Sequence, residues 1–158
     1  MAPQSTSCIT CLAVLGRQPH HRPLFLKVFG SRDTLTFHSY VHSSIDIIEE
    51  KLEALRTAPA PFDKYLGVLC LIDEYKVYGY ITTSDVKLIV ITEDVSIRET
   101  DIKSLFRWFH GLYVDGLMNP FTVVNEPIVS SRFSAEIDKV IGSFENILKT
   151  RTDNASSP

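Results

Sequence analysis

The sequence lacks the features that mark membrane-spanning, secreted and nucleic-acid-binding proteins. No apolar run approaches the ~20 residues that cross a bilayer, and residues 1–7 contain no Lys or Arg to begin a signal peptide. Three cysteines, an odd number, give no disulfide framework and favour a reducing compartment. The net charge is −3 without a cluster of Lys and Arg. We therefore expect no nucleic-acid partner and no membrane insertion.

The motifs of common enzyme classes are also missing. The sequence contains no G-x-x-x-x-G-K-[ST], no G-x-G-x-x-G and no G-x-S-x-G. Acidic residues at predicted strand ends are typical of turns rather than of a catalytic pair; they are Asp73, Glu74, Glu93 and Asp94. The sequence predicts a protein that is not an enzyme and that needs no cofactor.

Apolar periodicity predicts an α/β domain. Hydrophobic residues make up 44% of the 158 residues and charged residues 22%, as in ordinary globular domains. The predicted order is ββαβββαα. Strands are predicted over 8–15, 24–29, 65–72, 75–82 and 86–92, and helices over 37–56, 96–118 and 131–148.

Short turns between the last three strands indicate an antiparallel meander. The first, third and fifth strands are apolar at consecutive positions, which predicts that both faces of the sheet are covered. Ser96 and Glu99 match a capping box at the start of the second helix. Residues 8–149 form the predicted domain, between a flexible leader over 1–7 and a flexible polar tail over 150–158.

Two groups of possible metal ligands have a simpler interpretation. Cys8 and Cys11 form a C-x-x-C inside a predicted strand, where side chains three apart point to opposite faces, so we interpret both as small buried hydrophobes. His38, His42 and Asp46 share one side of the first helix, but three ligands along one straight helix converge poorly. A solvated or partner-facing flank is favoured, and metal-dependent chemistry through His38 and His42 is the alternative.

Two helix surfaces are predicted to bind other proteins. Tyr40 and Ile47 widen the apolar arc of the first helix to roughly 160°, more than one sheet face needs. Trp108 lies at the edge of the apolar stripe of the second helix, beside Arg107, and Trp and Arg are preferred interface anchors. Intramolecular packing is the alternative for both surfaces.

Several strings of the sequence occur together in one known family. They are FH at 37–38, VHSSID at 41–46, EK at 50–51, YLG at 65–67, DEYKVYGYIT at 73–82, NPF at 119–121 and IVSSRF at 128–133. The sequence thereby resembles the sedlin family of subunits of the trafficking protein particle (TRAPP) complex over about residues 8–148. The YKVYGY string is typical of the 2-like branch of this family. Thr122 departs from the Tyr that usually follows NPF, and segments 20–23 and 58–62 look lengthened.

The resemblance implies a longin-like (SNARE-like) fold. In this fold one helix covers one face of a five-stranded antiparallel sheet and two helices cover the other. It also implies a non-catalytic subunit of an assembly that tethers vesicles and acts as an exchange factor for Rab GTPases in ER–Golgi and Golgi traffic. Such a chain would be cytoplasmic and peripheral to the Golgi and the endoplasmic reticulum.

The implied partners are other TRAPP subunits: paralogous longin-like subunits, Bet3-like subunits and larger ones. A Rab GTPase would be reached only indirectly, through the assembly. Asp46 occupies the Leu/Ile-Asp position of the family on the first helix, which makes it a candidate contact with a neighbouring subunit. The alternative is a stand-alone longin-type module that binds SNAREs or a small GTPase directly.

Overall fold

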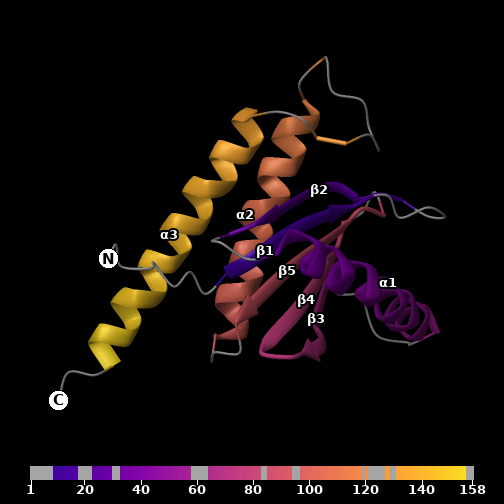
Figure 1. The fold of residues 1–158 in the computed structure, drawn as a ribbon, viewed down its shortest axis with the longest axis horizontal. Coiled ribbons are helices and arrows are strands. Elements are labelled where there is room, and N and C mark those ends of the chain that lie inside the picture. Colours follow the sequence, from indigo (N-terminus) through magenta and orange to yellow (C-terminus); the bar gives the residue numbers. More distant parts are fainter. Residues whose placement is uncertain are drawn as a thin grey trace.

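The predicted element order is confirmed (Figure 1). The computed structural model describes residues 9–17, 23–29, 33–57, 64–82, 85–93, 97–118, 120, 127–128 and 131–155. The strands are β1 (Ile9–Leu15), β2 (Pro23–Val28), β3 (Tyr65–Ile72), β4 (Tyr75–Ile81) and β5 (Lys87–Glu93). The helices are α1 (Thr34–Thr57), α2 (Glu99–Leu117) and α3 (Ser131–Ala155). The predicted leader lies outside the described residues.

The strands form one antiparallel sheet in the order β2-β1-β5-β4-β3. β1 therefore lies between its neighbour in sequence, β2, and the distant β5. The hydroxyl of Thr10 donates to the carbonyl of Ile91 at 2.9 Å, across a separation of 81 residues. β1 is buried along its whole length, and β5 is buried except at its last residue. These two apolar strands are the centre of the fold.

Helices cover both faces of the sheet, as predicted. α2 and α3 lie against one face, where Phe106, Phe109, Ile137 and Phe144 are fully buried with Leu12 and Val14 of β1. α1 lies against the opposite face (Figure 1). There Phe37, Val41, Ile48 and Leu52 pack on Cys11, Ala13 and Leu15 of β1. The five-stranded sheet with one helix on one face and two on the other confirms the longin-like fold class.

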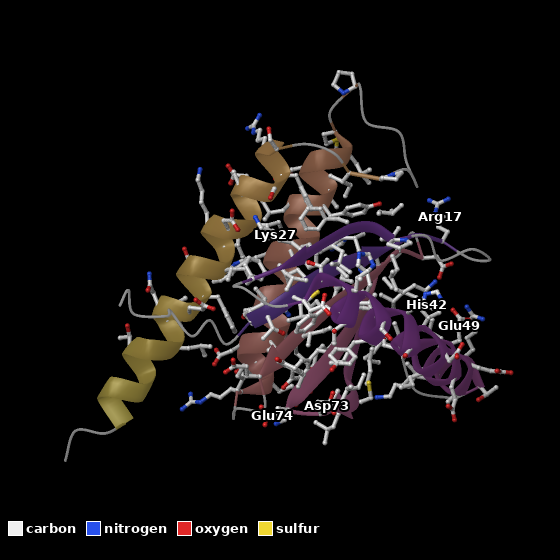
Figure 2. All side chains as sticks on the ribbon, viewed as in Figure 1. Arg17, Lys27, His42, Glu49, Asp73 and Glu74 are labelled. Carbon is white, nitrogen blue, oxygen red and sulfur yellow. The ribbon has the colours of Figure 1, made fainter. Side chains whose placement is uncertain are left out.

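The β2 edge of the sheet is covered from within the chain. The ammonium of Lys27 lies 2.6 Å from the Asp138 carboxylate of α3 and donates to the Ser134 hydroxyl at 2.8 Å (Figure 2). The amide of Ile128 donates to the carbonyl of Leu24 at 2.7 Å, so this residue adds one strand-like bond to β2. α3 and Ile128 thereby protect this edge from pairing with another chain.

β3 is the opposite edge strand, and the prediction that both of its faces are covered is wrong. Val68 is 42% exposed and Leu71 is 66% exposed. Sheet order is not a local property of sequence, so an apolar run cannot distinguish an edge strand from a central one. The pairing with β4 shifts register twice, around a Gly67 with φ of +77°. The Lys51 ammonium also donates to the carbonyls of Leu66 and Val68, and together these features blunt the edge.

Three helix ends differ from the prediction. α1 begins at Thr34 and not at Phe37. α2 begins at Glu99 after an N-cap at Arg98, whose side chain makes no capping hydrogen bond. The predicted capping box is therefore wrong, because Glu99 is the first helical residue and not the third; Ser96 lies outside the described residues. α3 continues to Ala155, so the predicted tail boundary falls inside this helix. No Gly or Pro follows Gly142 until Pro158, and the polar residues between them cost a helix little.

Candidate partner-docking surfaces

α1 presents a polar flank that contains the predicted contact residue Asp46. Asp33 begins the helix by accepting a hydrogen bond from the amide of Leu35 at 3.1 Å, a cap that the prediction missed. Leu35, His38, His42 and Asp46 are spaced three or four residues apart, so at ~100° per residue they share the side of the helix that faces away from β3. All four are exposed, and we call them the α1 flank.

Asp46 is available to another molecule. Within the part of the chain that the structure describes, its carboxylate takes part in no hydrogen bond or ion pair. Exposed Glu50 and Glu53 lie nearby on the same helix and extend its negative charge. Leu35, 77% exposed, adds a large apolar side chain at the start of the flank. The α1 flank therefore suits a partner surface that combines basic and apolar groups.

The other two predicted residues of α1 turn toward β3 and contact the chain itself. The hydroxyl of Tyr40 donates to the carboxylate of Asp73 at 2.6 Å, and its ring packs edge to face on Phe37. This hydrogen bond, followed by burial and the charge of Asp73, raises the pKa of Tyr40. Asp73 has a φ of 53° and forms the β3–β4 turn (Figure 2). Ile47 is half-buried against the α1-side core. Part of the wide apolar arc thus packs within the chain.

A buried lysine anchors the side of α1 next to the flank, and sequence reasoning missed it. Lys87, at the start of β5, is only 1% exposed, which is rare for a lysine unless it is paired. Its ammonium lies 3.4 Å from the carboxylate of Asp85 and 3.9 Å from that of Glu49. Figure 2 shows Glu49 and His42 along the same side of α1. The Lys87–Glu49 ion pair and the Tyr40–Asp73 hydrogen bond add two polar contacts to the apolar packing of α1.

The outward side of α2 is a second surface, on the opposite face of the sheet. Trp108 is 41% exposed and Arg107 is exposed, as the prediction of an interface anchor requires. Exposed Gly111, Val114 and Asp115 continue the same side of the helix. We call these five residues the α2 face. Because α1 and α2 lie on different faces of the sheet, the predicted residues form two separate surfaces.

The remaining candidate residues that the structure describes lie in the core or in turns. Cys11 is fully buried, which confirms it as a small buried hydrophobe, and this burial raises the pKa of its thiol to about 12. Cys8 lies outside the described residues. Among the described residues no three His, Cys, Asp or Glu side chains are placed to hold a metal ion. Asp73 and Glu74 form a turn, as predicted.

None of the described helices has the length and the apolar composition to cross a membrane.

Comparison with known proteins identifies relatives along most of the chain. The sequence model of the sedlin family matches residues 18–143, a range that includes both α1 and α2. A trafficking protein particle complex subunit 2-like protein from Dictyostelium discoideum is 36% identical over 140 residues, 85% of this chain and 97% of the relative. A protein of the same name from Xenopus tropicalis is 34% identical over 134 residues, which are 83% of this chain and 95% of the relative. The transport protein particle 20 kDa subunit of Schizosaccharomyces pombe is 29% identical over 100 residues, which are 63% of this chain and 68% of the relative.

Proposed function

Because the chain belongs to the sedlin family, we propose that it is a non-catalytic adaptor subunit of a TRAPP complex. The observation that carries this proposal is the match to relatives that are named as subunits of this particle. The matched region covers 95% and 97% of the Xenopus and Dictyostelium relatives, so the likeness concerns the whole domain rather than one motif. The exposed α1 flank and α2 face supply surfaces for docking.

In this proposal the complex tethers vesicles and acts as an exchange factor for Rab GTPases in ER–Golgi and Golgi traffic. The chain is a cytoplasmic protein, peripheral to the Golgi and the endoplasmic reticulum. Its partners are paralogous longin-like, Bet3-like and larger subunits, and it reaches the Rab GTPase only through the assembly.

The α1 flank is the proposed contact with a neighbouring subunit. Asp46 can accept hydrogen bonds from an Arg or Lys of the partner without losing an internal bond. The Glu49–Lys87 pair and the Tyr40–Asp73 bond hold the helix in place before a partner arrives. Such preorganisation lowers the entropy cost of binding.

The test replaces Asp46 in the full chain and measures co-purification of other TRAPP subunits from cells. Asp46→Tyr adds a bulky ring where the partner would sit, and we expect at least a roughly tenfold loss of affinity, about 1.4 kcal/mol. Asp46→Asn removes only the charge and should weaken binding less. Ser143→Tyr, at an exposed position of α3 on the face of the sheet opposite α1, is the matched control and should bind normally.

Circular dichroism separates a docking role from a structural one. Asp46 is exposed, so all three variants should keep the spectrum and the melting temperature of the unchanged protein. Unfolding of Asp46→Tyr would make the position structural. Normal co-purification of a folded Asp46→Tyr would exclude the α1 flank as the contact. A one-to-one complex of the purified chain with a SNARE or a small GTPase would instead favour the stand-alone module.

A further inference from the structure

α2 carries an apolar stripe on its outward side in addition to the one that it buries. The buried stripe consists of Ile102, Leu105, Phe106, Phe109 and Tyr113. Trp108, Val114 and Met118 are large apolar side chains that remain exposed, within an arc of roughly 120° on the other side. A helix whose outward side meets only water carries charged and polar residues on that side. The outward stripe indicates that another molecule covers the α2 face.

Gly111 lies at the middle of the α2 face, with open space around it in the described part of the chain. A glycine in a helix interior costs roughly 0.5–1 kcal/mol relative to alanine. A Cβ added at Gly111 would meet no atom within 4 Å, whereas one at Gly116 would lie 3.7 Å from the Phe133 ring. Nothing in the described part of the chain therefore requires a glycine at this position. A bare backbone does allow a second helix to approach closely from outside.

The charges of the α2 face are arranged symmetrically about this glycine. Arg107 lies four residues before Gly111 and Asp115 four residues after it. Both side chains are exposed, and neither has a hydrogen bond or an ion pair with any described residue. Trp108 and Val114 are likewise each three residues from Gly111. The oppositely charged pair and the apolar pair are each placed evenly about Gly111. This symmetry makes the helix complementary to an antiparallel copy of itself.

We propose that a second copy of this chain docks antiparallel on the α2 face, with the two helices crossing at Gly111. Arg107 and Asp115 each lie about 6 Å along the helix axis from Gly111. The two-fold rotation therefore places Arg107 of each copy level with Asp115 of the other copy. Trp108 of each copy is level with Val114 of the other. Over a pair of glycines the helix axes can approach to about 8 Å, which brings the opposite charges within reach of each other.

We expect this dimer to be weak because its interface is small. One helix face against another buries less than the ~1,200 Å² of a stable complex, so association requires a high local concentration. Incorporation into a larger assembly provides such a concentration. The proposal goes beyond the role of adaptor, because the α2 face would join two copies of the chain while the α1 flank contacts other subunits.

The test is sedimentation velocity of the purified full chain over a range of concentrations, with charge reversals. Because the dimer contains two equivalent contacts between positions 107 and 115, Arg107→Asp or Asp115→Arg alone creates two like-charge contacts. Each single reversal should weaken association at least about tenfold. The double reversal restores both pairs and should recover association to within about threefold. Gly111→Leu should abolish the dimer while keeping the monomer folded. Gly142→Leu, at an exposed glycine of α3 with equally open space, is the control and should dimerise normally.

Three results would overturn the proposal. The unchanged protein could remain monomeric at the highest concentration reached. The dimer could survive Gly111→Leu, which would place the interface elsewhere. The double reversal could associate no better than either single reversal, which would mean that Arg107 and Asp115 do not face each other. Rescue by the double reversal together with loss in Gly111→Leu supports the antiparallel pair.

Discussion

Gly79→Ala should destabilise the fold, because the side chain of Leu69 occupies the space above this glycine. Gly79 is buried in β4, between Gly67 of β3 and Ile89 of β5. An added Cβ would lie 2.9 Å from Cδ1 of Leu69 and 3.1 Å from both Cδ2 and Cγ. Ordinary carbon contacts are about 3.5–4.0 Å. Rotation of the terminal methyl groups would leave Cγ in place, so the whole side chain must move.

The cost follows from how tightly Leu69 is held. This residue is only 7% exposed and packs in the α1-side core, where overpacking costs about 1–3 kcal/mol. Alanine also restricts the unfolded chain, which offsets roughly 0.4–1 kcal/mol. We expect a net loss of about 1–2 kcal/mol in the free energy of unfolding. For a chain of this size the melting temperature should fall by roughly 2–8 °C.

Urea denaturation followed by circular dichroism measures this loss. Gly111→Ala, measured at low protein concentration, is the control with the opposite sign, since open space surrounds Gly111 and the helix gains up to about 1 kcal/mol. Leu69→Ala alone should cost about 2–5 kcal/mol. In the double variant Gly79→Ala/Leu69→Ala the clash disappears, so the loss should be smaller than the sum by about 1 kcal/mol. Additive losses, or a Gly79→Ala protein as stable as the unchanged one, would refute this account.

Three further predictions follow from burial and charge. Cys11, with a pKa of about 12, should resist alkylation at pH 8 in the folded protein and react after denaturation; modification of the native thiol at the rate of a free cysteine would contradict its burial. Burial, and then the charge of Lys64, lower the pKa of His110, so the unfolded chain binds the proton more tightly and stability should fall as the pH drops below about 6.5. His110→Gln should flatten this part of the pH profile, and an unchanged slope would assign it to other groups. Asp138→Asn breaks a part-exposed ion pair with Lys27 and should cost less than about 1 kcal/mol in urea denaturation.

Local patterns of the sequence predict most of the fold. The bounds of β3 are predicted without error, because Asp73 and Glu74 mark its end clearly. The exposure of Val68 and Leu71 could not be predicted, since it depends on β5 lying between β1 and β4. The apolar period of α3 ends at Leu148, so periodicity gave no sign of the polar turns that continue the helix to Ala155.

The docking surfaces were predictable in part. The 3.6-residue period places Asp46 on a polar side of α1 and Trp108 at the margin of the buried side of α2, and both are exposed in the structure. The hydrogen bond from Tyr40 to Asp73 joins residues 33 apart, and no periodicity reveals such a pair. Whether the predicted residues contact partners stays a prediction.

The position of β1 between β2 and β5 has a consequence for the chain as it is synthesised. A ribosome adds about 5–20 residues per second, so the 81 residues that separate Thr10 from Ile91 take about 4–16 s to make. During that time one long edge of an almost entirely apolar strand has no native neighbour. We therefore expect the nascent chain to be prone to aggregate, and to benefit from a chaperone, until β5 emerges.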